Sequence, residues 1–288
     1  MAIITSPANP HIRALQRLHT TRGRKKSGLF LMEGPHLLEA LLDAHVMPRE
    51  VYYQPGLLER TVQGQALLGR LRALTGREHF SLVEVSERVI EALGETQTSQ
   101  GLVCVMDMAD FSPRQVYARR VSRRRPALLI LDDLADPGNM GTVLRTALAA
   151  DVEAVLLTDN CVDHFSPKVV RAAAGAHVAL PIEPDLSWST IEARVLAHCT
   201  VGAGRDTSEI PRILLAESSS VHNYYDEDLT LPFALVIGNE ARGPSAAARA
   251  HATASVSIPL FNGVESLNAA MAAGIILYEA VRQIHQGR

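Results

Sequence analysis

The first hundred residues alternate between helical and strand-like hydrophobic patterns. Leucines recur at helical spacing in LLEALLDA, residues 37–44, whereas EVYYQP (50–55) and QGLVCVM (100–106) are short apolar runs typical of strands. This alternation predicts an α/β domain over residues 1–106.

From residue 127 onward the α/β pattern is stronger. The predicted strands cover 127–134, 153–159, 179–183, 233–238 and 254–260, and the predicted helices cover about 140–150, 167–177, 188–198, 244–251 and 266–285. Continuous apolar strands separated by helices indicate a parallel sheet covered on both faces. Ligands of such sheets bind beyond the carboxyl ends of the strands.

Two segments depart from this pattern. Residues 107–126, DMADFSPRQVYARRVSRRRP, are polar and basic and end at a proline, which predicts a linker between a domain at 1–106 and another at 127–288. Residues 204–232 have a serine-rich middle and an acidic end. They are expected to form an insertion or a mobile loop with no more than one strand.

The composition fits a globular protein and narrows its class. Hydrophobic residues make up 47% of the 288 residues and charged residues 20%, so two domains with a sizeable core are expected. No apolar run is long enough to span a membrane and the first residues show no secretory pattern, which predicts a cytoplasmic protein. The cysteines Cys104, Cys161 and Cys199 are widely spaced and predict neither a disulfide framework nor a metal site.

The charge distribution points to a nucleic-acid partner that the net charge of −3 does not indicate, because the chain contains two basic segments. Neither segment contains an acidic residue. Residues 1–32 carry Arg13, Arg17, Arg22, Arg24, Lys25 and Lys26, and residues 111–131 carry Arg114, Arg119, Arg120, Arg123, Arg124 and Arg125. Local cationic excess is typical of proteins that bind a phosphate backbone. RNA is the favoured partner for the first segment, whereas the second is equally consistent with a solvated linker.

The stretch DPGNMGTVLRTA, residues 136–147, follows the first strand of the second half and places a charge in a helical pattern. Asn139 is a suitable N-cap for the following helix. Helical side chains lean toward the helix N-terminus, so Arg145 is expected to pass over Gly141 and to reach the helix start, where anions bind well. A surface ion pair is the alternative for Arg145.

Two further strand ends carry polar residues. In VIGNEARGPS, residues 236–245, Glu240 follows a strand that ends at Gly238, and Pro244 is expected in the first turn of the next helix. In SIPLFNGVESLNAAMAAG, residues 257–274, Ser266 is the expected N-cap and Asn268 lies in the first helical turn. The small residues that follow favour close packing against a helix or a second subunit.

Other α/β enzymes share a parallel sheet with glycine-rich turns. A dinucleotide-binding dehydrogenase would carry GxGxxG, a nucleoside triphosphatase GxxxxGK[ST], and a serine hydrolase GxSxG. None of these patterns occurs at a strand end. These three classes are therefore disfavoured.

Taken in order, the three polar segments resemble the SpoU/TrmH family of RNA ribose 2′-O-methyltransferases, within the SPOUT superfamily. The resemblance rests on N-x-G-x-x-x-R-T-A from Asn139 to Ala147, on G-N-E-x-x-G-P from Gly238 to Pro244, and on SIPL followed by ESLN up to Asn268. Residues 9–42 and the pair Gln100-Gly101 also resemble the family's L30e-like substrate-recognition domain. The resemblance covers most of the chain outside residues 204–232.

The resemblance implies a fold and a cofactor. Residues 127–288 are expected to form an α/β domain with a trefoil knot, a topology that general connection rules disfavour. The implied cofactor is S-adenosylmethionine, held through backbone groups of Gly238, Ile258 and Leu267. The implied assembly is a homodimer that needs no metal.

The family's polar residues fall on Asn139, Arg145, Glu240, Ser266 and Asn268. A guanidinium is effectively always protonated, so Arg145 is expected to clamp the target phosphate and stabilise the developing alkoxide rather than act as a base. Ser266 and Asn268 are expected to orient Arg145 and the ribose. Glu240 either fixes its own loop or pairs with Arg145.

The implied function is methylation of a ribose 2′-hydroxyl in ribosomal RNA, with 23S rRNA as the expected substrate. The RNA is expected to be bound by Arg22, Arg24, Lys25 and Lys26. Resistance to a ribosome-targeting antibiotic is a role found among such enzymes. The alternatives are a tRNA methyltransferase and a non-catalytic RNA-binding or ribosome-assembly module on the same fold.

Overall fold

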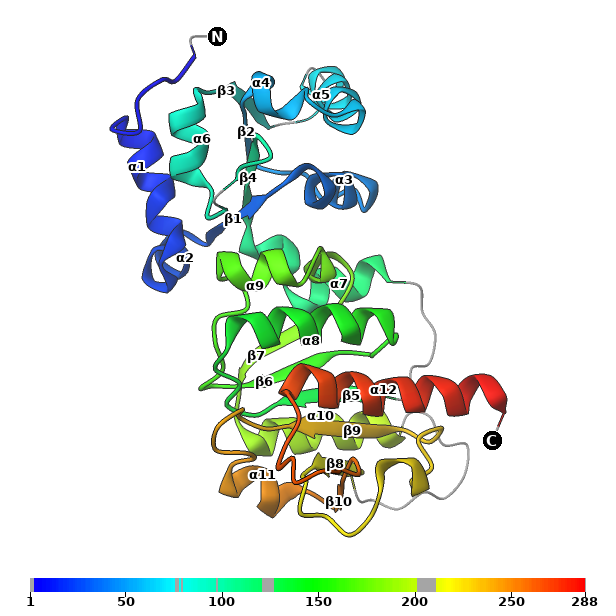
Figure 1. Cartoon of the computed structure of the whole chain (residues 1–288). Helices are drawn as coiled ribbons and strands as arrows, with labels where there is room; N and C mark the ends of the chain where they lie inside the picture. Colours follow the sequence, from blue (N-terminus) through cyan, green and yellow to red (C-terminus); the bar gives the residue numbers. More distant parts are fainter. Residues whose placement is uncertain are drawn as a thin grey trace. The chain divides into compact units, whose positions relative to one another are not determined.

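The chain folds into two units, and the first is assembled from two separate stretches of sequence. In the computed structural model, unit 1 comprises Met1–Gln115 with Asp163–Val178, and unit 2 comprises Val116–Val162 with Ala179–Arg288. The structure describes residues 3–75, 78, 80–96, 98–120, 127–200 and 211–287. Each unit has its own sheet (Figure 1).

Unit 1 is built on a four-stranded mixed sheet in the order β1-β4-β2-β3. Its strands are β1 (Leu29–Glu33), β2 (Glu50–Tyr53), β3 (Ser81–Glu84) and β4 (Leu102–Asp107). Strand β4 runs antiparallel to both β1 and β2, whereas β2 and β3 are parallel. Its helices are α1 (Pro10–Gln16), α2 (Thr21–Ser27), α3 (Pro35–Asp43), α4 (Pro55–Leu58), α5 (Val62–Leu74) and α6 (Glu87–Leu93).

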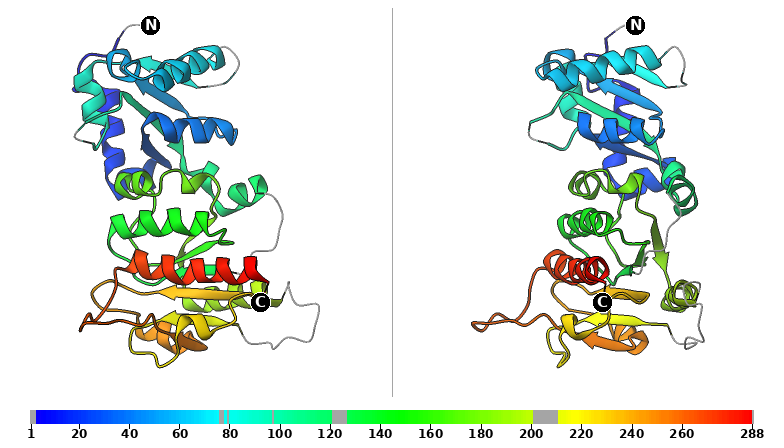
Figure 2. Two further views of the ribbon diagram at one scale, coloured as in Figure 1. Left: turned by 45° about the vertical axis from the view of Figure 1, so that its right-hand side comes forward. Right: turned by 90° about the vertical axis from the view of Figure 1, so that its right-hand side faces the viewer.

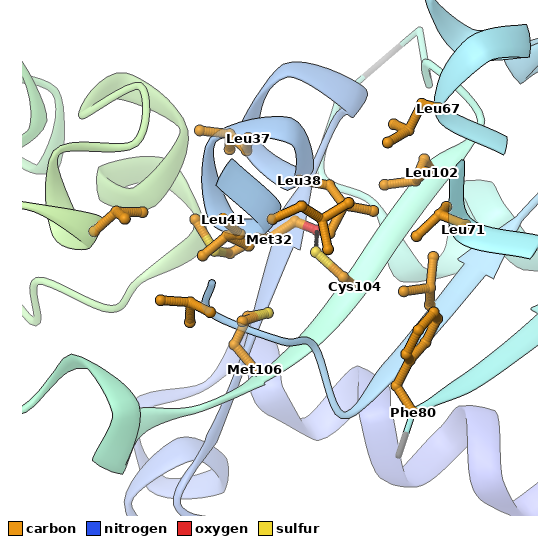
Figure 3. Close-up of a cluster of buried hydrophobic side chains, with 14 of the residues drawn as sticks. Met32, Leu37, Leu38, Leu41, Leu67, Leu71, Phe80, Leu102, Cys104 and Met106 are labelled. Atoms are coloured by element: carbon orange, nitrogen blue, oxygen red, sulfur yellow. Dashed lines mark hydrogen bonds between the residues drawn. The ribbon is translucent and has the colours of Figure 1, made fainter. Parts of the chain in front are cut away.

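Helices cover both faces of this sheet because side chains of a strand alternate between its faces. Cys104 and Met106 of β4 belong to the core beneath α3 and α5, while the intervening Val105 belongs to the core beneath α1 and α6. Figure 3 shows the first of these cores, where the Cys104 thiol donates a hydrogen bond to the carbonyl of Met32. Burial raises the pKa of this thiol to about 12.

The segment Asp163–Val178 completes unit 1. It contains α9 (Pro167–Ala172) and a 3₁₀ turn at Ala176–Val178, where one helix over 167–177 was predicted. Ala174 and Gly175 have positive φ angles and separate the two pieces. Phe165 packs against Phe30 with ring centroids 4.6 Å apart, so this segment contributes to the unit 1 core.

The stretch predicted as a linker is partly helical. It contains the end of β4, a 3₁₀ helix at Met108–Phe111 and α7 (Pro113–Arg119), while residues 121–126, with Arg123, Arg124 and Arg125, lie outside the described residues. Arg120 donates hydrogen bonds to the carbonyls of Glu153 and Val152. This arginine therefore has a structural role in unit 2.

Unit 2 contains a six-stranded, all-parallel sheet in the order β10-β8-β9-β5-β6-β7. The predicted α/β class with a parallel sheet is confirmed. The strands are β5 (Ala127–Leu131), β6 (Val155–Thr158), β7 (Ile182–Leu186), β8 (Ile213–Ala216), β9 (Phe233–Ile237) and β10 (Ala254–Val256). The helices are α8 (Pro137–Ala149), α10 (Trp188–Thr200), α11 (Ala246–His251) and α12 (Ala269–Gln286).

Helices lie on both faces of this sheet as well (Figure 1). Helices α10 and α11 share a hydrophobic core with alternate residues of β5, β8 and β9. Helices α8 and α12 pack together on the other face, where Gly274 of α12 brings its backbone close to Thr146 of α8. Every residue of β5 and β9 is buried, as expected for central strands of a doubly covered parallel sheet.

The segment 204–232 was expected to be an insertion or a mobile loop with no more than one strand, and its described part contains the strand β8 as a member of the central sheet. Residues 204–210 lie outside the described residues, but β8 lies inside the sheet, between β10 and β9. Because β8 is only four residues long, its pattern did not distinguish a strand of the central sheet from a strand within an insertion. The serine-rich residues that follow it therefore start at a carboxyl end of the sheet, where ligands bind.

Candidate functional site

Three loops that follow β5, β9 and β10 meet at the carboxyl edge of the unit 2 sheet. Strands β5 and β9 are hydrogen-bonded neighbours, and from β5 the chain continues to β6 on the other side. The strand order thus changes direction between them, which is the position where open α/β sheets bind ligands. The loop after β9 carries Glu240, and the segment between β10 and α12, which projects from the sheet in Figure 2, carries Ser266 and Asn268.

A chain of hydrogen bonds connects these loops. The Asn268 side-chain amide donates to Oδ1 of Asn139 at 2.8 Å, and the Asn139 amide donates to Oε1 of Glu240 at 2.9 Å. The carboxylate of Glu240 also accepts from the backbone N–H groups of Asp136 at 3.2 Å and Ala135 at 3.4 Å. The structure therefore brings together one polar residue from each predicted motif.

The hydrogen bonds to Glu240 favour its ionised form. Partial burial raises the pKa of this carboxyl, but the bonds from Asn139 and from the backbone at Asp136 and Ala135 outweigh that effect, and the net pKa is lowered. None of these donors is a cation, so the loop edge keeps a negative charge. Glu240 is therefore bonded to the loop after β5, and among the described residues it makes no ion pair with Arg145.

The predicted N-caps are wrong, although each lies close to the true one. Helix α8 begins at Pro137 and is capped by Asp136, whose carboxylate accepts from the N–H of Asn139 at 2.8 Å. Helix α12 is capped by Asn268, which accepts from the N–H groups of Ala270 and Met271, and not by Ser266. Both asparagine amides are consequently free to join the chain of hydrogen bonds.

A cavity of about 370 Å³ lies beside Glu240, within the range of small-molecule sites. Its lining includes the predicted cofactor residues Gly238, Ile258 and Leu267, and also Ser266. Apolar side chains line it together with Glu217, Glu240, Arg242 and Arg249. Arg249 pairs with Glu217, whereas Glu240 has no cationic partner among the described residues, which suits a ligand with an aromatic base and a positive charge. These features fit S-adenosylmethionine, whose sulfonium and ammonium groups are cationic.

Gly238 sets the shape of this cavity. A Cβ atom at this position would lie 2.5 Å from the nitrogen of Pro244, closer than real Cβ atoms approach. Pro244 does not occupy the first turn of a helix as predicted, because α11 begins at Ala246 and is capped by Ser245. It instead packs against the end of β9 and holds the loop closed.

Arg145 is not part of the chain of hydrogen bonds that joins Asn268, Asn139 and Glu240. Its side chain is exposed on α8, and among the described residues it makes no hydrogen bond or ion pair, contrary to the alternative of a surface ion pair. It is also absent from the residues that line the cavity. The guanidinium is therefore available to a ligand outside the cavity.

Asn239 and Asp132 shape this site, although the sequence assigned no role to either. Asn239 donates to the carbonyl of Asp133 at 2.8 Å, and its side-chain oxygen accepts from the N–H groups of Ala241 and Arg242. Asp132 is buried and accepts from the N–H of Ser245 at 2.6 Å. A polar pair directly after a buried strand was the signal that could have identified Asp132 and Asp133.

The N-terminal cations of unit 1 fall into two groups. Arg22, Lys25 and Lys26 are exposed on α2, as an RNA contact requires. The prediction is wrong for Arg24, which is 1% exposed and donates to Asp163 at 2.6 Å and to the carbonyls of Leu18 and His19. Burial raises the pKa of Asp163, but its bond and charge interaction with Arg24 lower the pKa more.

The described ranges offer neither a metal site nor a membrane-spanning helix. No group of three or more His, Cys, Asp or Glu residues there is arranged to hold a metal ion. No helix in the described part of the chain is long and apolar enough to cross a membrane.

Comparison with known proteins agrees with the geometry. Residues 126–278 match the SpoU rRNA Methylase family, and residues 9–104 match the MRM3-like substrate binding domain. The chain is 34% identical over 98% of its length to an uncharacterized tRNA/rRNA methyltransferase of Synechocystis, covering 94% of that protein. It is 30% identical over 96% of its length to the 23S rRNA (guanosine(2553)-2′-O)-methyltransferase RlmP of Bacillus subtilis, covering 98% of that protein.

Among solved structures, the SpoU methyltransferase AviRb from Streptomyces viridochromogenes in complex with the cofactor AdoMet is similar over 97% of this chain and 100% of that one. The two share 25% of residues and the TM-score is 0.80. The motif residues, the parallel sheet and the match over more than half of its length show that this chain belongs to the SpoU rRNA methylase family.

Proposed function

We propose that this protein transfers a methyl group from S-adenosylmethionine to a ribose 2′-hydroxyl of ribosomal RNA. The observation that carries the proposal is the chain of hydrogen bonds from Asn268 through Asn139 to Glu240 beside the cavity. In the reaction a carbon–oxygen bond forms, the carbon–sulfur bond breaks, and the hydroxyl loses its proton. The products are the 2′-O-methyl ribose, S-adenosylhomocysteine and a proton.

Bound S-adenosylmethionine supplies an electrophilic methyl group, and the residues of the site orient the reactants. Asn139 and Glu240 hold the loops after β5 and β9 in register, which aligns the hydroxyl with the methyl group. Gly238, Ile258 and Leu267 line the cavity and hold the cofactor. Ser266 lines the same cavity and orients the ribose together with Asn268.

Arg145 is assigned to the RNA side of the site. A guanidinium holds its proton under all ordinary conditions, so it cannot take the proton of the hydroxyl. Its free donors suit a phosphate, and its charge stabilises the oxygen as it becomes negative. This role agrees with its exposure and its lack of a partner in the described residues.

In this proposal, RNA recognition and cofactor binding belong to different units. Unit 1, with an L30e-like fold, recognises RNA through Arg22, Lys25 and Lys26, and unit 2, with a knotted chain, binds the cofactor. The match to a substrate binding domain over 9–104 and the exposure of these cations support this division. RlmP acts on 23S rRNA, which makes 23S rRNA in the cytoplasm the proposed substrate.

The proposal includes a homodimer. Met271 and Tyr278 of α12 are 59% and 49% exposed, and the projecting segment before α12 exposes Phe261 to 74%. Met271, Ile275 and Tyr278 lie on one helical face, since they are four and three residues apart. An apolar face of this kind is typical of a surface that a second subunit covers. Light scattering of the purified protein should give twice the mass of the 31.2 kDa chain.

Mapping of 2′-O-methyl groups tests the function. Ribosomal RNA from a strain that lacks the gene should lose one modified ribose, and the purified protein with S-adenosylmethionine should restore it. Loss of a site in tRNA instead would replace the substrate, and an unchanged pattern in both RNAs would favour the non-catalytic module. Antibiotic susceptibility of the same strains tests whether the methylation confers resistance to a ribosome-targeting antibiotic.

A further inference from the structure

The cavity contains a second carboxylate that none of the sequence motifs includes. Glu217 follows β8 directly, and the cavity is lined by Ala216, Glu217, Ser218 and Ser219 as well as by the loop after β9. The N–H of Glu217 donates to the carbonyl of Val256 at 3.0 Å, which fixes its backbone to β10. Its side chain is only 23% exposed.

Arg249 of α11 holds this carboxylate in place. Its Nε and Nη2 donate to the same oxygen, Oε1 of Glu217, at 3.0 and 2.6 Å. Its Nη1 donates to the carbonyl of Pro244 at 2.5 Å. One guanidinium therefore joins two walls of the cavity, the end of β8 and the loop after β9.

This arrangement leaves Oε2 of Glu217 without a hydrogen-bond partner among the described residues. A carboxylate oxygen in a partly enclosed site gains from a donor, and Glu217 lines the cavity. The donor is therefore expected to come from the ligand.

The charges of the two carboxylates indicate which part of the ligand each one meets. Glu240 has only amide and backbone donors and keeps its negative charge, which suits the cationic part of the cofactor. The charge of Glu217 is neutralised by Arg249, so it attracts a cation weakly but remains a good acceptor for a neutral donor. S-adenosylmethionine has two kinds of neutral donor, its adjacent ribose hydroxyls and its adenine amino group, and of these a hydroxyl forms the shorter bond to a carboxylate oxygen.

We propose that Glu217 accepts a hydrogen bond from the ribose hydroxyls of bound S-adenosylmethionine, and that Arg249 is the positioning residue that presents it. The inference rests on the proposed cofactor and adds the residue that recognises its sugar. It also gives a role to the serine-rich segment after β8.

Calorimetry with S-adenosylhomocysteine and its 2′-deoxyribose and 3′-deoxyribose analogues tests this pairing without the reaction. The wild-type protein should bind one deoxy analogue about tenfold more weakly or worse, because a hydrogen bond to a charged group is lost. Glu217→Ala should bind S-adenosylhomocysteine about tenfold more weakly and should no longer distinguish the analogues. In Arg249→Lys, which cannot bridge both walls, the discrimination should shrink.

Glu227→Gln is the matched control, because Glu227 lies in the same segment, pairs with Arg212 at 2.9 Å, has a side chain 28% exposed and does not line the cavity. It should bind all the ligands as the wild type does. A deoxy penalty that persists in Glu217→Ala, or wild-type affinity for S-adenosylhomocysteine in that variant, would overturn the assignment of Glu217. No binding of S-adenosylhomocysteine by the wild type would overturn the proposed cofactor and this inference with it.

Discussion

Asn268 and Asn139 are 129 positions apart in the sequence, yet the amide of one donates to the amide oxygen of the other at 2.8 Å. Asn268 has a second task, since its own oxygen caps α12 through the N–H groups of Ala270 and Met271. One side chain therefore fixes the start of a helix and links two loops of the site.

Asn268→Asp separates these two tasks. The aspartate keeps the oxygen that caps the helix but loses the amide that donates to Asn139, and it adds a negative charge near Glu240. Methyl transfer should fall about tenfold or more, which corresponds to the loss of about 1.4 kcal/mol, while the midpoint of thermal unfolding stays close to that of the wild type. Asn268→Ala should lose activity and also about 1 kcal/mol of stability, because the cap is removed. Equal unfolding midpoints for both variants would contradict the capping role.

Glu240→Gln tests the origin of the lowered pKa of Glu240. The folded protein favours the ionised carboxyl through bonds from Asn139 and the backbone. Because the folded pKa lies below the unfolded one, this stabilisation is complete above the ordinary pKa of a glutamate and is lost as the pH falls through the folded pKa. The wild type should therefore be more stable than Glu240→Gln at pH 7, and the difference should shrink toward pH 3.

Urea unfolding at several pH values measures this difference. Glu265→Gln is the control, because Glu265 is exposed and makes no bond or ion pair among the described residues. A stability difference that stays constant between pH 7 and pH 3 would show that the ionised form of Glu240 is not the one favoured by the fold.

The sequence predicted β5, β6, β9 and β10 because continuous apolar runs such as 233–238 leave few alternatives for a buried strand. It placed β7 too early, at 179–183 instead of Ile182–Leu186, and gave β8 no position. It also predicted polar residues that meet at the sheet edge, but it assigned the helix caps to the wrong ones. Whether Asp136 or Asn139 caps α8 depends on backbone geometry that two neighbouring good caps do not distinguish. The burial of Arg24 could not be predicted, since its partner Asp163 lies 139 positions away and joins unit 1 only through the tertiary fold.

Arg145→Ala should separate catalysis from cofactor binding. Arg145 lies outside the cavity and has no partner among the described residues, so its loss removes no contact that shapes the cofactor site. Methyl transfer should fall about a hundredfold, the usual effect of removing a group that stabilises a developing anion. Calorimetry should give an unchanged affinity for S-adenosylhomocysteine.

Arg145→Lys refines this assignment. A lysine keeps the charge but loses the paired donors that hold a phosphate, so most of the activity should remain lost. Near-normal transfer by Arg145→Ala, or a loss of cofactor affinity that matches the loss of activity, would show that Arg145 does not act on the RNA side.

Arg24 should matter for stability rather than for RNA contact. Its guanidinium is buried and bonded to Asp163, so Arg24→Gln leaves a largely buried carboxylate without its cation. Breaking one partner of a buried pair costs about 3–5 kcal/mol, which urea unfolding can measure. Arg22→Gln is the control on the same helix and should leave the free energy of unfolding unchanged. Similar stability of the two variants would contradict the buried role of Arg24.

The exposed cations of α2 should control RNA affinity. The triple variant Arg22→Gln, Lys25→Gln and Lys26→Gln keeps Arg24 and its bond to Asp163, so the fold of unit 1 is retained. Each phosphate contact that is removed should lower the slope of log affinity against log salt by about 0.7–0.9. Fluorescence anisotropy with an rRNA fragment between 50 and 200 mM salt gives this slope, and calorimetry should show unchanged binding of S-adenosylhomocysteine. An unchanged slope would mean that these cations form only a solvated face and that the RNA lies elsewhere on the protein.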